Sequence, residues 1–434
     1  MDQKRQRVWI PMLLLLLCIS AGIHAAQAIR LKETRMQLNM ERQRDMTDVV
    51  RAMADIEVNL EKLLIASGAA QNVAILGETA LLAQHVETGL SRLPLDAEAA
   101  SGAMKFAGQM GDYAMTLAEQ VSGGKNLSEE DERQIEDMLV CCQGLNSHLL
   151  SVGGRLYDEP ILAAKEGAAA WQDEAIAGDG RLNYPSLIYD GPFSDAKTPA
   201  APKGLTGERI TREQARNLAA RFSGTSADRI SDAADSGGQF EAFGFAADTE
   251  DGRISVQITG QGGHLLWMMP EQAEFKPRIL RETCEKNAQA WLSGMGYGEM
   301  VRCFTQEYDG MTVMNFAAVQ DGVLIYPDQV KVQVSMESGR VVGAECSQYL
   351  MNHAPRTGLE PALSMEEAQT ALSSRLEVTG GLLCVIPTDG SERLCWGFEG
   401  MFAGAKYYAF VDANTGKPLD ILRIDTTQEG ETAV

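Results

Sequence analysis

The chain has 434 residues, of which 45% are hydrophobic, so it can form two or more packed domains and is not globally disordered. Its 38 basic and 60 acidic side chains give a formal net charge of −22. Both halves are acidic, which excludes a basic face for nucleic acid phosphates and disfavours contact with anionic lipid surfaces. The charge either complements a basic protein partner or only keeps the chain soluble.

The N-terminus carries an apolar run, roughly residues 8–28, preceded by the basic residues Lys4, Arg5 and Arg7. Such a run is either a signal peptide, cut near Ala28, or a single membrane span. About 21 residues at 1.5 Å per residue suffice to cross ~30 Å of hydrocarbon. We therefore expect an uncleaved anchor, with a cytoplasmic N-terminus and an exported body.

Residues 31–180 show apolar positions spaced by three and four, which predict amphipathic helices that each bury one face. Breaks at Gly68, Pro94 and the turn 123–126 separate four such stripes. Short loops favour antiparallel neighbours, so we expect an up-and-down bundle. The stripes are Met46, Val49, Met53, Ile56, Leu60 and Leu63; Leu76, Thr79, Ala83, Val86, Leu90 and Leu93; Ala103, Phe106, Met110, Tyr113 and Leu117; and Ile135, Met138, Cys142, Leu145, Leu149, Val152 and Leu156.

The start of the fourth helix has its own signal, because Ser128 and Asp131 have the spacing of a capping box. A fifth helix is expected at about 159–177. A helical bundle directly outside a membrane span is also typical of a sensor ectodomain, but no kinase or cyclase domain follows it. A sensor of this kind would have to signal through another protein.

The stretch YPSLIYDGPFSDA, residues 184–196, joins the helical part to the rest of the chain. Asp190-Gly191 is a turn pair, and Pro192 holds Gly191 away from helical angles. Its aromatic side chains bring more apolar area than a linker needs, so we expect either packing between domains or a partner contact. The residues assigned to this partner-binding or interdomain role are Tyr184, Tyr189, Asp190, Gly191, Pro192, Phe193 and Asp195.

After a Pro/Gly-rich linker, 195–208, one pattern occurs three times. The segment 256–267 aligns without gaps on 332–343 and on 409–420, which brings Gly263, Gly339 and Gly416 together. A glycine at this position predicts a hairpin between two strands. In each copy the glycine is followed by a basic residue or histidine: His264, Arg340 and Lys417.

Other local signals support the repeat. Thr211 with Gln214, and Ser364 with Glu367, predict capped helices that begin 52 residues before Gly263 and Gly416. Each copy therefore reads as one helix plus an antiparallel sheet with one covered face. Either the sheet edges remain free for strand addition by a partner, or the repeats pair with each other and consume them. The middle copy has two further hairpin turns, Asp309-Gly310 and Asp321-Gly322, and alternates Val330, Val332 and Val334 with Lys331, Gln333 and Ser335.

Common catalytic and cofactor motifs are absent from the sequence: there is no HExxH, GxSxG, Walker loop or GxGxxG before a helix. The eight cysteines form no CxxC pair and the five histidines are isolated, so we expect no metal, no cofactor and no catalytic residue. Most thiols are expected to be buried, and a Cys384–Cys395 bridge between adjacent strands is left open.

The junction stretch resembles the YDGPFSDH signature of the spore germination protein YpeB family, with Ala196 in place of the final histidine. The layout is similar too, with a membrane segment, a helical domain, the signature and then PepSY-type repeats. The resemblance implies a non-enzymatic protein tethered in the spore inner membrane, facing the cortex. It implies that the protein positions, stabilises or restrains a SleB-like cortex-lytic hydrolase. A ligand-sensing protein that signals through a partner is the alternative, and a wall hydrolase is a third.

The expected fold is therefore multidomain α and α+β, with an N-terminal membrane helix, an antiparallel bundle and three PepSY-like repeats of a helix plus an antiparallel sheet. The expected boundaries are 1–30 for the anchor or signal segment, 31–180 for the bundle, 181–208 for the signature junction and linker, 209–270, 271–355 and 356–426 for the repeats, and 427–434 for a tail.

Overall fold

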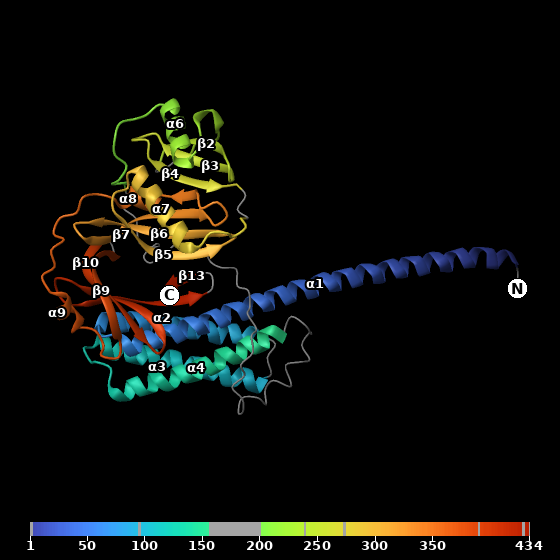
Figure 1. Cartoon of the computed structure of the whole chain (residues 1–434). Helices are drawn as coiled ribbons and strands as arrows, with labels where there is room; N and C mark the ends of the chain where they lie inside the picture. The colour runs from blue at the N-terminus through green and yellow to red at the C-terminus, as the bar shows by residue number, and fades with distance from the viewer. Residues whose placement is uncertain are drawn as a thin grey trace. The chain divides into compact units, whose positions relative to one another are not determined.

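A computed structural model describes residues 3–93, 97–155, 201–237, 240–271, 275–388, 391–427 and 430–433 (Figure 1). The fifth helix expected at 159–177 and the junction stretch 184–196 lie outside these residues. The chain divides into a helical unit, within residues 1–64 and 72–184, and a sheet unit formed by 65–71 and 185–434.

The helical unit confirms a helical N-terminal region, and its breaks fall where the glycine and proline signals predict them. Its helices are α1 (Gln3–Ile65), α2 (Ala69–Arg92), α3 (Ala97–Ser122) and α4 (Glu129–Arg155). No helix in the described part of the chain combines the length and apolarity that a membrane crossing requires. Most of the segment 8–28 falls among residues whose side chains are not described.

Most residues of the predicted stripes are buried, while Phe106, Tyr113 and Met138 are half-buried and the side chains of Val152 and Leu156 lie outside the described ones. Val49, Met53 and Ile56 are fully buried on α1, as are Val86 and Leu90 on α2. Glycine shortens the distance between these two helices, because a Cβ at Gly89 would lie 2.3 Å from Val49 Cγ2. Periodicity alone therefore specifies which side of each helix faces the bundle.

The capping box of α4 is confirmed. The Ser128 amide donates to Asp131 Oδ2 at 2.9 Å, and the Asp131 amide donates to Ser128 Oγ at 3.2 Å. Tyr113 of α3 also donates its hydroxyl proton to Asp131 Oδ1 at 3.0 Å. The cap thus fixes the start of α4 and ties it to the preceding helix.

Adjacent cysteines on α4 give a test of this packing. Cys141 is exposed, whereas Cys142 is buried, and burial raises the pKa of the Cys142 thiol to about 12. Because the thiolate is the reactive form, a maleimide at neutral pH should label Cys141 and spare Cys142 in the native chain. Fragment-ion mass spectrometry would locate the label, and denatured protein should be labelled at both. Equal labelling of both thiols in the native chain would contradict the burial of this helix face.

The sheet unit is built from three consecutive segments, each of which has one helix followed by four strands, with η2, α8 and β13 as additions to the first, second and third segment, respectively. The first contains α6 (Arg212–Ser223), the short 3-10 helix η2 (Ala227–Arg229), β1 (Ile230–Asp232), β2 (Ala242–Thr249), β3 (Gly252–Thr259) and β4 (Leu265–Pro270). The second contains α7 (Arg281–Met295), β5 (Met300–Tyr308), β6 (Met311–Gln320), β7 (Val323–Ser335), β8 (Val341–Glu345) and α8 (Ser347–Asn352). The third contains α9 (Met365–Gln369), β9 (Glu377–Thr388), β10 (Ser391–Phe402), β11 (Ala405–Asp412), β12 (Pro418–Thr427) and β13 (Gly430–Ala433).

The three aligned glycines form the same turn, with φ of 69° at Gly263, 75° at Gly339 and 70° at Gly416. In each case the residue four positions earlier closes the hairpin, donating its amide to the carbonyl of the residue after the glycine at 2.8–2.9 Å. A side chain at the glycine would be strained in this left-handed region. The spacing in the sequence therefore identified equivalent hairpins.

Each of these glycines also packs against the apolar residue that lies two positions before the first helix of the same segment. A Cβ on Gly263, Gly339 or Gly416 would come within 3.0–3.2 Å of the Cδ1 atom of Ile210, Ile279 or Leu363, respectively. Helix and hairpin thus pack through the same contact in all three segments. The two predicted capping boxes, at Thr211 and Ser364, are confirmed, although α9 is only five residues long.

The strands of all three segments belong to one 13-stranded sheet, in the order β1-β2-β3-β4-β8-β7-β6-β5-β13-β12-β11-β10-β9 (Figure 1). The first segment joins the second through the antiparallel pair β4–β8. The second joins the third twice, through β5–β13 and through a parallel contact between β7 and β9. These joints are short: two residue pairs for β4–β8, one for β5–β13 and two for β7–β9. Of the two alternatives for the edges, mutual pairing occurs, but it takes up only part of the edges that meet.

Some expected loops are ordered parts of this unit. Residues 201–207, expected to end a free linker, bind the second segment: the Gly204 amide donates to the Leu350 carbonyl at 2.8 Å. A Cβ on Gly204 would lie 2.9 Å from the Tyr349 carbonyl oxygen, so glycine permits this approach. Residues 430–433, expected to be a tail, form β13 and pair with β12.

The expected alternation of β7 holds only over 330–334; the half from Val323 to Val330 is buried on both faces, because this strand contacts two segments. Cys384 and Cys395 lie directly opposite each other on β9 and β10, and both are free thiols.

Candidate functional site

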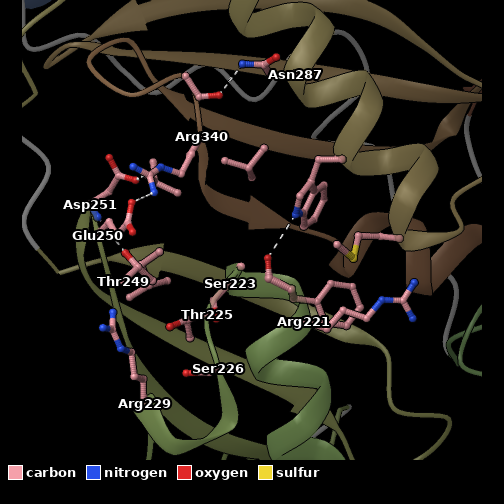
Figure 2. Close-up of a pocket in the computed structure, with 18 of the residues that line it drawn as sticks. Arg221, Ser223, Thr225, Ser226, Arg229, Thr249, Glu250, Asp251, Asn287 and Arg340 are labelled. Carbon is pink, nitrogen blue, oxygen red and sulfur yellow. Dashed lines mark hydrogen bonds and ion pairs between the residues drawn. The ribbon is translucent and has the colours of Figure 1, made fainter.

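The signature residues assigned to partner binding or interdomain packing all lie outside the described residues: Tyr184, Tyr189, Asp190, Gly191, Pro192, Phe193 and Asp195. The described part of the sheet unit instead offers a cleft of about 680 Å³ between its first and second segments (Figure 2). Its walls come from the end of α6, the loop after it, the β2–β3 turn, α7 and the β7–β8 hairpin. Cavities of this size commonly hold small ligands or short peptide segments.

The floor of the cleft is apolar. Phe222 and Ile254 are buried there, while Trp291, Met295 and Val341 are half-buried. The rings of Phe222 and Trp291 lie 6.3 Å apart, and Trp291 Nε1 donates to the Phe222 carbonyl at 3.2 Å. This hydrogen bond fixes the indole and uses its only donor.

One wall of the cleft is an ion-pair bridge between the two segments. Arg340, which follows the turn glycine of the β7–β8 hairpin, pairs with Glu250 and, through Nε at 3.0 Å, with Asp251 of the β2–β3 turn (Figure 2). The hydrogen bond between Arg340 and Glu250 raises the pKa of the guanidinium and lowers the pKa of the carboxyl. Arg340 is therefore neutralised by its neighbours.

Two further arginines lie at the rim, away from that bridge. Arg221 is exposed and uses Nη2 to donate to the Gly294 carbonyl at 2.8 Å. The side chain of Arg229 is exposed and makes no hydrogen bond or ion pair with any described residue, although its charge adds to that of Arg340 in lowering the pKa of the Glu250 carboxyl. Figure 2 shows them on different sides of the cleft, with Arg229 on the side of the Arg340 bridge.

Three further polar side chains of the lining already donate hydrogen bonds to backbone carbonyls. Ser223 Oγ donates to the Ala219 carbonyl at 2.7 Å, and Thr225 Oγ1 donates to the Asp248 carbonyl at 3.0 Å. Asn287 Nδ2 donates to the Gly339 carbonyl at 2.6 Å. The Ser223 and Thr225 hydroxyls therefore spend their protons on backbone carbonyls of the protein itself.

A row of aromatic rings leads from the cleft through the second segment. Trp291 lies 6.4 Å from Tyr297, Tyr297 meets Tyr349 edge-on at 5.1 Å, and Tyr349 stacks on His353 at 4.2 Å. Burial raises the pKa of Tyr349 to about 12, so this ring stays neutral at physiological pH. The row ends at a charged cluster.

This cluster, named here the Arg356 cluster, consists of Arg356, Asp328, Glu392 and His353. Arg356 donates to both Asp328 oxygens at 2.7 and 2.8 Å and to both Glu392 oxygens at 2.9 Å. His353 Nδ1 lies 2.7 Å from Asp328 Oδ2. Burial acts to lower the pKa of Arg356, but the hydrogen bonds to Glu392 and Asp328 outweigh it and raise that pKa. The cluster joins β7, the loop that follows α8, and β10.

The sequence missed both the cleft and the Arg356 cluster. The sequence analysis noted Arg340 only as the basic residue after a repeated glycine. It also treated His353 as isolated, which is wrong, because the fold places this histidine beside Asp328. No short spacing connects Asp328 with Glu392 or Glu250 with Arg340, because strand pairing brings them together. Over the residues that the structure describes, no group of three metal-binding side chains was found.

Comparison with known proteins gives matches over both units. A family described as "YpeB N-terminal" matches residues 30–162, and one described as "YpeB sporulation, PepSY1 and PepSY2 domains" matches residues 179–358. The second match includes the signature stretch and every residue of the cleft lining.

Three similar proteins are named "Sporulation protein YpeB". The one from Halalkalibacterium halodurans is 26% identical over 280 residues, 63% of this chain and 61% of that protein, so the match spans less than two thirds of it. The proteins from Oceanobacillus iheyensis (22% over 361 residues, 79% and 80%) and Bacillus subtilis (24% over 355 residues, 77% and 79%) match at greater length. A solved structure, "Bacillus megaterium YpeB C-terminal domain", is 27% identical with a TM-score of 0.47 and covers 50% of this chain and 100% of that one.

Proposed function

The chain belongs to the YpeB family of sporulation proteins, and from this premise we propose that it is a non-enzymatic accessory protein of spore germination. It positions, stabilises or restrains a SleB-like cortex-lytic hydrolase. Its N-terminal apolar segment anchors it in the spore inner membrane, so that the two units face the cortex.

The observation that carries this proposal is the cleft, whose described lining combines an apolar floor and arginines with hydroxyls that are already hydrogen-bonded. A surface of this kind supports binding without reaction. The edge-to-edge joining of three segments also favours a rigid platform, because the second and third are connected by two separate strand contacts.

A second candidate is an extracytoplasmic ligand-sensing protein that signals through a partner. The size of the cleft, about 680 Å³, favours it, because this lies in the range of small-molecule sites. A rise in melting temperature with a small ligand, without recovery of any protein partner, would favour the sensor over the accessory protein.

Crosslinking in dormant spores, followed by purification of the chain, tests the main proposal. The native chain should recover the cortex-lytic hydrolase, and Phe193→Ala should recover less of it, since the signature aromatics are expected to anchor a contact. Leu81→Ala is the matched control, because Leu81 is a large apolar residue of α2 that is 70% exposed. Recovery of no hydrolase, or release of fragments from cortex peptidoglycan by the purified chain, would contradict the proposal.

A further inference from the structure

The chemistry of the cleft between the first two segments is specific enough to select a class of occupant. Its lining carries three arginines, Arg221, Arg229 and Arg340, and two carboxylates, Glu250 and Asp251. Arg340 is paired with both carboxylates, and three guanidinium groups against two carboxylates leave the lining with one formal positive charge in excess. On a chain of net charge −22, this is a local surface for carboxylates.

The floor between these arginines requires an apolar group. Trp291, Met295 and Val341 line the cleft and are half-buried, so part of each side chain stays accessible. Tryptophan and arginine are the residue types most often found at the energetic centres of interfaces, and methionine adapts its shape to a partner. An occupant with carboxylates on both sides of a bulky apolar side chain would match both features.

The hydrogen bonds inside the cleft argue against a heavily hydroxylated occupant such as a glycan. Trp291, Asn287, Ser223 and Thr225 all donate to backbone carbonyls of the protein itself. A sugar would therefore lose hydrogen bonds to water without finding enough partners in the cleft. Charged and apolar contacts remain, and a peptide segment can use both.

We propose that this cleft binds an extended acidic segment of a partner protein, in which carboxylates flank a bulky apolar side chain. The proposal rests on the proposed function, since it names where and by what chemistry a partner is held. The acidic body as a whole would attract basic surfaces, so this cleft selects a segment of the opposite charge from the one that the overall composition favours.

The test uses the full chain and a fluorescent synthetic peptide that alternates aspartate and leucine, with a lysine–leucine peptide of equal length for comparison. The acidic peptide should bind saturably, more weakly as salt is raised, and the basic peptide should not bind. Arg229→Glu and Arg221→Glu should each weaken binding roughly tenfold or more, because each places a like charge opposite a carboxylate.

Arg209→Glu is the matched control and should bind like the native chain, because Arg209 belongs to the same segment, is exposed and pairs with Glu241 outside the cleft lining. Unchanged melting temperatures would show that the variants fold. Equal binding of both peptides, or native binding by Arg229→Glu, would overturn the proposal. Complete displacement by citrate at an equal carboxylate concentration would show a small-anion site and overturn it as well.

The failure of the cleft proposal and the failure of the proposed function would give different results. If the hydrolase is still crosslinked to the Arg229→Glu chain in spores, the accessory role stands and the cleft is not where the hydrolase docks. If the acidic peptide binds as expected but no hydrolase is recovered from spores, the cleft assignment stands and the accessory role fails.

Discussion

Replacing Arg356 with alanine should lower the free energy of unfolding of the sheet unit by about 3–5 kcal/mol, because the buried carboxylate of Asp328 would lose its main partner. The Asp328 side chain is 1% exposed, and Arg356 donates to both of its oxygens. Glu392 would lose both of its hydrogen bonds from Arg356 as well. Denaturant titration of the full chain, followed by tryptophan fluorescence, measures the loss.

Arg393→Ala is the control for Arg356→Ala, because Arg393 lies next to Glu392 on β10, is exposed and makes no side-chain hydrogen bond or ion pair with any described residue. The Arg393→Ala change should lower the free energy of unfolding by less than about 0.5 kcal/mol. Adding Asp328→Asn to Arg356→Ala should restore part of the stability, since the stranded charge is then removed. A loss below about 1 kcal/mol for Arg356→Ala would mean that the cluster behaves like a surface ion pair.

Alanine at Gly310 should destabilise the chain far more than alanine at Gly322, although both glycines end an Asp-Gly turn of the second segment. Both have left-handed backbone angles, with φ of 72° and 80°, and each follows an aspartate with positive φ. A Cβ on Gly310 would lie 1.9 Å from the Phe275 carbonyl oxygen, whereas nothing lies within 4 Å of one on Gly322.

The shared backbone strain should cost about 1–2 kcal/mol in each variant. Moving the Phe275 carbonyl should add about 1–3 kcal/mol at Gly310 only, for a total of about 2–5 kcal/mol. Thermal unfolding of the two alanine variants beside the native chain gives both values. Equal losses of stability in the two variants would show that the backbone at Phe275 moves away at no cost, so that only the backbone angle matters at Gly310.

Much of the local structure was predictable because its causes are local. Most residues of the apolar stripes of α1 to α4 are buried, since a period near 3.6 places such residues on one side of a helix. The capping boxes at Ser128, Thr211 and Ser364 are present, because a cap needs only the residue three positions on. The hairpin glycines were identified for the same reason, as a left-handed turn favours glycine wherever it occurs.

The candidate site was less predictable, because its residues come together only through strand pairing. The signature stretch attracted attention through its composition, yet it lies outside the described residues, and the cleft depends on residues spread from Arg221 to Val342. With 60 carboxylates in the chain, no sequence rule selects Asp251 for Arg340, or Asp328 and Glu392 for Arg356. Only the register of distant strands makes that selection.

By itself, then, the sequence determined that the N-terminal part is helical, where α4, α6 and α9 begin and where the three equivalent hairpins turn. Tertiary structure alone decided that the hairpins share one sheet, that β13 is a strand and not a tail, and that a cleft opens between the first two segments. The physical reason is the distance along the chain between interacting residues. Caps and turns form hydrogen bonds within a few residues. Sheet edges and buried charges find partners that no fixed spacing gives, as when β13 pairs with β5 and Arg356 with Asp328.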